Sequence, residues 1–123
     1  MINKAILVGR LGADPEVRYA TNGNMVTSFQ VATDESYKNK SGEKVQKTEW
    51  HRIVIWGKLA EIAAQYTHKG DLVYIEGKIQ SRSWDDKDGN KRTTTEILAS
   101  ALRILSGKKE QPAGPPEDED VPF

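Results

Sequence analysis

Residues 48–66 read TEWHRIVIWGKLAEIAAQY and contain two different periods of apolar residues within one stretch. Up to Trp56 the stretch is rich in β-branched and aromatic residues, which is typical of a strand. After Gly57 the apolar side chains recur at positions i, i+3, i+4 and i+7. This spacing predicts a short helix that ends near Gly70, with residues 68–69 in its last turn. The side chains on its apolar face are Leu59, Ile62, Ala63 and Tyr66.

The rest of the sequence predicts a mainly β domain around this helix. The predicted strands span residues 3–11, 25–33, 45–56, 72–84 and 92–105. The first is an apolar run bounded by glycines, and an Asp88-Gly89 turn precedes the last. In the fourth, Val73, Ile75 and Ile79 share the apolar face. A helix between strands 3 and 4 of five matches the OB-fold, a five-stranded Greek-key barrel, although other small α+β barrels share this pattern.

Length and composition indicate one domain outside the membrane. The chain has 123 residues, 37% hydrophobic and 29% charged, with a mean hydropathy of −0.66. Its longest apolar runs have four residues, far short of the roughly 20 that span a bilayer. The N-terminus has no signal-peptide pattern and the chain has no Cys, so we expect a cytoplasmic protein without disulfides or thiolate metal sites.

The net charge of zero hides an uneven distribution along the chain. Residues 110–123 hold five of the 18 acidic side chains and no Lys or Arg, so residues 1–109 carry 18 basic against 13 acidic side chains. A basic body of this kind is attracted to polyanions. Beyond Ser106 the sequence has Gly, Pro and Lys but almost nothing apolar to bury. We expect a domain over residues 1–106, a disordered linker over residues 107–117, and an acidic tip over residues 118–123.

Nothing in the sequence indicates catalysis, a cofactor or a metal site. The only histidines, His51 and His68, have no metal-ligand spacing, and no nucleophile elbow, P-loop or dinucleotide-binding motif is present. The acidic turn at residues 85–89 suggests calcium, but an EF-hand in that register would place Thr95 where Glu is required. A solvated hairpin turn is predicted there instead.

Four aromatic residues stand beside basic ones, namely Tyr37, Trp50, Trp56 and Trp84. A single Trp in a strand is often a core or interface anchor. However, Trp50 and Trp56 share a strand face with Arg52, and Trp84 follows Arg82 on a polar face. Unpaired charge is costly beside a buried ring. Rings interleaved with cations suit single-stranded nucleic acid, whose bases stack while its phosphates meet Lys and Arg.

Several motifs resemble, in the same order, those of the bacterial single-stranded DNA-binding protein family. They are LVGRLGADPEVRY (residues 7–19), TEWHR (48–52), WGKLAE (56–61), KG (69–70), VYIEG (73–77) and DEDVPF (118–123). The resemblance covers residues 1–105 and the last six. It implies an OB-fold, a homotetramer and sequence-independent binding of single-stranded DNA. It also implies a C-terminal tip that docks replication, repair and recombination proteins, and hence a cytoplasmic, nucleoid-associated protein.

The resemblance also assigns roles to individual residues. The base-stacking aromatics fall on Tyr37, Trp50, Trp56 and Trp84, and many relatives have Trp and Phe at the first and third of these positions. His51 matches a histidine at the subunit interface of the family. The cations that we assign to phosphates are Arg18, Arg52, Lys58 and Arg82. Residues 107–117 form a shorter linker than is common in the family.

The last six residues combine acids with an apolar ring and a free carboxylate, a chemistry suited to a pocket that captures a chain terminus. The predicted partner-binding residues are Asp118, Glu119, Asp120, Val121, Pro122 and Phe123. Acidic tails also aid solubility, which is the alternative for this segment. For the domain, the alternatives are a primosome-type or RNA-binding OB protein and a small metal-dependent nuclease.

Overall fold

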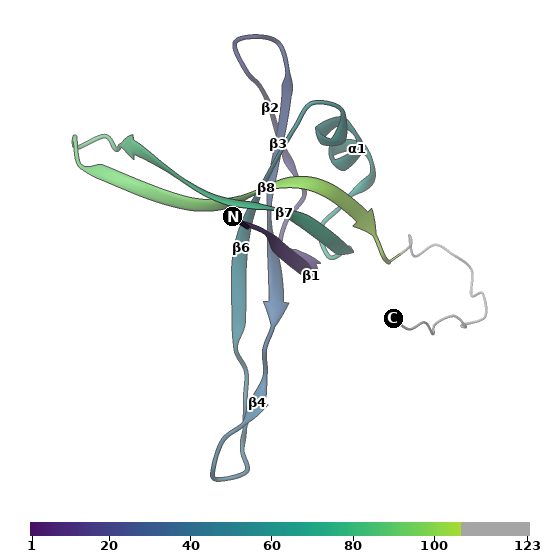
Figure 1. Cartoon of the computed structure of the whole chain (residues 1–123). Coiled ribbons are helices and arrows are strands. Elements are labelled where there is room, and N and C mark those ends of the chain that lie inside the picture. The colour runs from purple at the N-terminus through teal and green to yellow at the C-terminus, as the bar shows by residue number, and fades with distance from the viewer. Residues whose placement is uncertain (107–123) are drawn as a thin grey trace.

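Residues 1–106, the part of the chain that this computed structural model describes, form eight strands and one helix (Figure 1). The elements are β1 (Ala5–Leu11), β2 (Glu16–Tyr19), β3 (Met25–Asp34), β4 (Tyr37–Lys38), β5 (Lys44–Val45), β6 (Thr48–Trp56), α1 (Lys58–Tyr66), β7 (Leu72–Asp85) and β8 (Lys91–Ile104). The five predicted strands correspond to β1, β3, β6, β7 and β8. The predicted linker at 107–117 and tip at 118–123 lie outside the described residues.

The five long strands close into a barrel. The sheet order is β1-β7-β8-β6-β3-β2, and an additional pairing of β1 with β3 through Arg10 and Leu11 completes the ring. All pairings in this sheet are antiparallel except β6 with β8, where Ile53 lies opposite Ile97. The sequence pattern did not predict strand β2, which pairs antiparallel with the first four residues of β3. The predicted OB-fold, with its helix after the third barrel strand, is confirmed.

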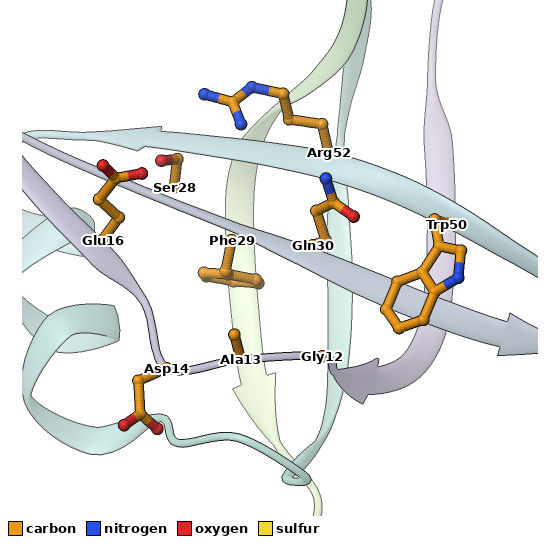
Figure 2. Close-up of a pocket in the computed structure, with 9 residues that line it drawn as sticks. All are labelled: Gly12, Ala13, Asp14, Glu16, Ser28, Phe29, Gln30, Trp50 and Arg52. Carbon is orange, nitrogen blue, oxygen red and sulfur yellow. The ribbon is translucent and has the colours of Figure 1, made fainter.

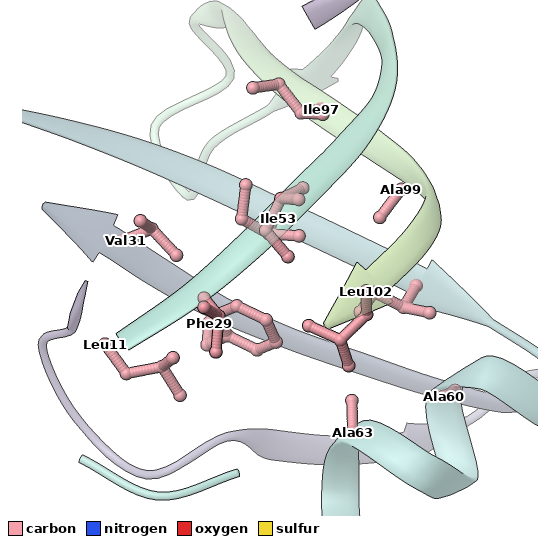
Figure 3. Close-up of a cluster of buried hydrophobic side chains, with 12 residues drawn as sticks. Leu11, Phe29, Val31, Ile53, Ala60, Ala63, Ile97, Ala99 and Leu102 are labelled. Carbon is pink, nitrogen blue, oxygen red and sulfur yellow. The ribbon is translucent and has the colours of Figure 1, made fainter. Parts of the chain in front are cut away.

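Side chains from all five barrel strands meet in the core (Figure 3). Residues with no exposed surface include Val31, Ile53, Ile55 and Ile75. Side chains alternate between the two faces of a strand, and these four point toward the inside of the barrel. Removing one such side chain to Ala typically costs about 2–5 kcal/mol. The remaining core members are Leu11, Phe29, Ala60, Ala63, Val73, Ile97, Ala99 and Leu102.

The helix α1 packs on the barrel through small residues. Ala60 and Ala63 are fully buried, and the Thr27 hydroxyl donates to the Ala60 carbonyl at 2.8 Å. Leu59 also packs partly against the core, whereas Ile62 and Tyr66, predicted on the same apolar face, are exposed. No helix of residues 1–106 is long and apolar enough to cross a membrane.

The helix ends earlier than predicted. Its last residue is Tyr66, and the backbone of Thr67 is extended. The Thr67 backbone N–H and hydroxyl both donate to the Ala63 carbonyl, at 3.1 and 2.6 Å. Gly70 lies in the following turn with a φ of 89° rather than ending the helix.

Two hairpins extend beyond the barrel, one formed by β7 and β8 and one by β4 and β5 (Figure 1). The β7–β8 pairing runs from Val73 opposite Ile104 to Asp85 opposite Lys91, so its distal half leaves the core. For this reason Ile79, predicted on the apolar face with Val73, is exposed.

Candidate nucleic-acid interface

One face of β6 carries exposed rings and a cation. Strand alternation turns Trp50, Arg52, Val54 and Trp56 to the same side, opposite the buried Ile53 and Ile55. Trp50 and Trp56 remain 53% and 47% exposed. Buried core anchors would not leave half of each ring in solvent, so these rings are available to a ligand.

The strands beside β6 extend this face on both sides. On one side, β3 places Gln30 opposite Arg52, and β2 adds Arg18 opposite Val26. On the other side, the β7–β8 hairpin places Gln80 opposite Glu96, followed by Arg82 and Trp84 at alternate positions of β7. Strands that lie far apart in the sequence thus contribute to one surface.

Two hollows lie next to each other on this surface. The first, shown in Figure 2, is lined by Gly12, Ala13, Asp14, Glu16, Ser28, Phe29, Gln30, Trp50 and Arg52. The second is lined by Arg18, Tyr19, Ala20, Val26, Arg52, Val54, Trp56, Gln80, Arg82 and Glu96. Arg52 lines both hollows and therefore joins them. We call the combined surface the aromatic groove.

Gly12 makes room for the ring of Trp50. A Cβ atom at Gly12 would lie 2.5 Å from Cζ3 of Trp50, closer than non-bonded carbon atoms approach each other in proteins. The backbone N–H of Gly12 donates to the Gln30 carbonyl at 3.0 Å, which ties this turn to β3. The absence of a side chain at Gly12 therefore lets the indole lie against the turn and form one wall of the first hollow.

Trp84 continues the same face outward along the β7–β8 hairpin. Its indole N–H donates to the Thr94 hydroxyl at 2.8 Å, which fixes the ring across the two strands. The ring is nevertheless exposed. At the tip of the hairpin, the Arg92 guanidinium and the backbone N–H of Asn90 hold the pKa of the Asp86 carboxyl below its usual value.

A buried carboxylate lies among the guanidinium groups of this surface. Glu96 is only 3% exposed and accepts hydrogen bonds from Gln80 Nε2 at 2.9 Å and from Arg82 Nε at 3.3 Å. Sequence reasoning missed it. Counting outward from a two-residue Asp88-Gly89 turn would have placed Glu96 opposite Ser81. The loop is one residue longer, with the Asp86 backbone N–H donating to the Asn90 carbonyl at 3.0 Å, and this sets Glu96 opposite Gln80.

The structure brings together most of the predicted site residues. Arg18, Trp50, Arg52, Trp56 and Arg82 line the aromatic groove, and Trp84 lies two residues beyond Arg82 on the same face. The other two residues of the prediction lie outside both hollows. These are Tyr37, which is exposed on the β4–β5 hairpin, and Lys58, which begins α1.

His51 occupies the opposite face of β6 from Trp50, as predicted from alternation. It is half-buried, and its Nε2 lies 3.0 Å from the hydroxyl of Thr33 on the neighbouring strand. His51 therefore does not share the strand face that carries Arg52 into the aromatic groove.

A second surface, on β1 and the adjoining parts of β7 and β8, differs in kind. Ile6 and Val8 point outward there and are 57% and 49% exposed. The rest of this surface, which we call the β1 face, consists of Leu72, Tyr74, Glu76, Ala101, Arg103 and Leu105.

The charges of Lys4 and Glu76 are paired on the β1 face. The Lys4 ammonium lies 2.7 Å from Glu76 Oε2, and the Tyr74 hydroxyl donates to Glu76 Oε1 at 2.8 Å. These hydrogen bonds hold the pKa of Glu76 below its usual value, and the carboxylate raises the pKa of Lys4. In the aromatic groove, in contrast, the guanidinium groups of Arg52 and Arg82 share the buried carboxylate of Glu96, and Arg18 is exposed.

A closed five-stranded barrel with exposed rings and guanidinium groups on one face defines an oligonucleotide-binding barrel. The model of the single-strand binding protein family matches residues 2–105, and this chain belongs to that family. The family predicted from the sequence motifs is thus confirmed. Membership supports single-stranded DNA binding as the function, and points to a non-catalytic protein.

Individual relatives agree with this assignment. The chain is 52% identical over 118 residues to the single-stranded DNA-binding proteins of two Neisseria meningitidis strains, of serogroups A and B, covering 96% of this chain and 68% of each relative. It is 51% identical over 108 residues to single-stranded DNA-binding protein 1 of Chlorobaculum tepidum, covering 87% of this chain and 67% of that protein.

Two solved structures share the fold. The Plasmodium falciparum SSB in complex with ssDNA has a TM-score of 0.78 at 32% identity, and the alignment covers 86% of this chain and 96% of that one. A deletion mutant of the single-stranded DNA binding protein from Thermus aquaticus has a TM-score of 0.74 at 29% identity, covering 87% of this chain and 52% of that one.

Proposed function

We propose that this protein binds single-stranded DNA along the aromatic groove without regard to sequence, and protects exposed strands during replication, recombination and repair. The observation that carries the proposal is the alternation of exposed rings with guanidinium groups on one barrel face. Every base has a π-face that can stack on a ring, and every nucleotide has a phosphate that can meet a cation. Sequence-independent binding follows from those two interactions.

Replacing Trp84 tests this proposal away from the core. Trp84→Ala should weaken binding to oligo-dT and to mixed-sequence strands alike, while the thermal unfolding temperature stays unchanged. The matched control is Tyr66→Ala, because Tyr66 is also an exposed ring but lies on α1. Binding is followed by quenching of tryptophan fluorescence. A Trp84→Ala variant that unfolds, or that binds as tightly as the parent, would remove this ring from the interface.

Two rival functions can be tested with the parent protein and labelled single-stranded DNA. An RNA-binding or primosome-type protein would prefer RNA, or fail to discriminate, when labelled single-stranded DNA competes with RNA of equal length. A small nuclease would shorten the labelled strand in the presence of divalent metal. We expect preferential binding of DNA and an intact strand after prolonged incubation with Mg²⁺.

We further propose that four copies assemble, using the β1 face. Among residues 1–106, β1 pairs with β7 along Ala5–Arg10 but with β3 only through Arg10 and Leu11, so one edge of residues 5–8 has no neighbouring strand. An open strand edge next to exposed aliphatic side chains favours pairing with a second copy. The pairing of Lys4 with Glu76 removes one cation that a phosphate could use, which argues for a protein occupant.

His51 is proposed as a second subunit contact, since it is half-buried on the side of β6 away from the groove. His51→Lys should lower the mass measured by light scattering as the protein is diluted. His68→Lys is the matched control, because His68 is exposed after α1. If His51→Lys keeps its mass on dilution but loses affinity for DNA, His51 belongs to the DNA interface instead.

The C-terminal residues Asp118 to Phe123, outside the described residues, are proposed to recruit replication, repair and recombination proteins. The support is their chemistry: an acidic run followed by an apolar ring suits an apolar pocket with a basic rim. Through these partners and chromosomal single strands, the protein would associate with the nucleoid.

Deleting Phe123 alone tests recruitment because it keeps every acid of the tail. The shortened protein should bind DNA as the parent does, but should fail to capture replication and repair proteins, identified by mass spectrometry, from a bacterial lysate. Capture of the same proteins by both forms would leave only a solubility role for the tail.

A further inference from the structure

An acidic side chain inside a DNA-binding groove requires explanation, since its charge repels phosphate. Glu96 is nearly inaccessible to solvent and lies on β8, between β6 and β7. Its Oε2 accepts from Gln80 and its Oε1 accepts from Arg82 Nε. Both donors come from β7, which fixes the carboxylate plane.

Arg52 approaches the same oxygen from β6. Its Nε lies 3.6 Å from Glu96 Oε1, close enough for an ion pair but too long for a hydrogen bond. This Nε is buried and has no hydrogen-bond partner among the described residues. The side chain as a whole is 29% exposed, and in Figure 2 it extends toward the side of Glu16 and Ser28, away from the Trp50 ring.

We propose that Glu96 is a positioning residue for DNA binding. It holds the Nε side of Arg82 and Arg52 inward, so that the paired Nη groups of each guanidinium face the aromatic groove. A guanidinium is planar and its donors form a rigid fork, so fixing Nε also fixes where the Nη pair points. One carboxylate between two guanidinium groups leaves a net positive charge for the phosphates. This inference rests on the proposed function.

Two explanations of Glu96 predict opposite changes in DNA affinity when Glu96 is replaced by Gln. If only net charge matters, Glu96→Gln removes a negative charge from the groove and tightens binding. If Glu96 orients the arginines, the same change releases both side chains and weakens binding, although the groove becomes more positive. Glutamine keeps the shape of the side chain, so the comparison isolates the charge-assisted hydrogen bonds.

The experiment measures the affinity of the full chain for oligo-dT over a series of salt concentrations. For Glu96→Gln we expect binding about tenfold weaker at low salt, a loss of the size that charge-assisted hydrogen bonds carry. We also expect the slope of log K against log salt to become shallower by about 0.7 for each phosphate of the single strand that the variant no longer neutralises.

Matched variants control for charge and for shape. Glu49→Gln makes the same charge change one residue from Trp50, on the other side of β6, and should leave affinity and slope unchanged. Glu96→Asp keeps the charge and should recover part of the binding. Circular dichroism and light scattering establish that each variant is folded and assembled.

Arg82→Lys keeps the test decisive if Glu96→Gln does not fold. Lysine keeps the charge but has no fork to orient, so Arg82→Lys alone should weaken binding in an otherwise intact protein. Where both variants fold, Arg82→Lys should cost little in the Glu96→Gln background, because the fork is already released.

The outcomes separate this inference from the proposed function. A parent protein that does not bind oligo-dT refutes the proposed function itself. A parent that binds, with Glu96→Gln or Arg82→Lys binding equally or more tightly and with an unchanged or steeper salt slope, refutes the positioning role of Glu96 alone.

Discussion

The aromatic groove and the β1 face both expose large apolar side chains, yet their neighbours differ. In the groove, Trp50 and Trp56 flank Arg52 along one strand. On the β1 face, Ile6 and Val8 are aliphatic, and the nearby charges of Lys4 and Glu76 neutralise each other. Exposed apolar area alone therefore does not identify a partner. Flat rings interleaved with guanidinium groups suit nucleic acid, whereas aliphatic side chains beside an unpaired strand edge suit another protein chain.

The largest expected effect comes from damaging each of the two surfaces in turn. Trp50→Ala combined with Trp56→Ala should abolish most DNA binding and leave the assembled mass unchanged. Stacking of about 1–3 kcal/mol per base is a value taken from single-strand binding proteins of this kind rather than from this structure. Removal of two rings then corresponds to a loss of roughly thirtyfold or more.

The reciprocal variant is Val8→Asp, which places a charge on the apolar surface of β1. It should reduce the mass measured by light scattering while each separated subunit still quenches its tryptophan fluorescence on binding oligo-dT. Loss of assembly in the double tryptophan variant, or unchanged assembly in Val8→Asp, would show that the two surfaces are not separate.

A second prediction displaces a ring without removing it. Gly12→Val places a side chain where the indole of Trp50 lies, so the ring must move out of the wall of the first hollow. We expect about tenfold weaker binding, comparable with the loss of one stacked base. In a Trp50→Ala background, Gly12→Val should add little. Additive losses would mean that Gly12 acts through the backbone rather than through Trp50.

Salt sharpens the comparison without any substitution. If Arg18, Arg52 and Arg82 each meet one phosphate, the slope of log K against log salt is about −2, and a fourfold rise in salt weakens binding by about twentyfold. Assembly through aliphatic side chains should instead persist as salt rises. DNA binding is measured by fluorescence titration and subunit assembly by light scattering, on the same sample. If the assembly dissociated at the salt concentrations that release DNA, DNA binding and assembly would not depend on separate surfaces.

Local patterns predicted what depends on local residues. The change of period at Gly57 and the alternation in β6 predicted the helix, the barrel strand before it and the shared face of Trp50 and Trp56. What the patterns could not supply depends on packing between distant segments. Ile62 is exposed because α1 contacts the barrel through Ala60, Ala63 and, in part, Leu59, and Ile79 is exposed because its strand continues past the core.

The missed carboxylate has the same explanation. Glu96 receives donors from β7 and approaches Arg52 of β6 only because β8 lies between those two strands. The β7–β8 register depends on whether the hairpin loop has two residues or three, and the parallel pairing of β6 with β8 joins segments separated by the helix and a strand. No local period carries that information.

The smallest expected effects concern pH, and they separate the two regions once more. Glu76 on the β1 face and Asp86 at the hairpin tip both have a pKa below the usual value, held there by Lys4 and Arg92 respectively. A carboxyl whose pKa is lower in the folded state stabilises that state above its ordinary pKa, and this contribution is lost as pH falls through the folded-state pKa. Between neutral pH and about 4, neither pair should therefore weaken.

Below about pH 4, protonation should break the Lys4–Glu76 pair on the β1 face and the Arg92–Asp86 pair at the hairpin tip, each with a local effect. Glu76→Gln should remove part of the acid sensitivity of the assembled mass, and Asp86→Asn should remove part of the acid sensitivity of Trp84 emission, read in a variant that keeps Trp84 as its sole tryptophan. Because both pairs include an exposed cation and a partly exposed carboxyl, the changes should be small and should shrink further in high salt. If Asp86→Asn instead altered assembly, or Glu76→Gln altered Trp84 emission, the aromatic groove and the β1 face would be coupled through the β7–β8 hairpin rather than independent.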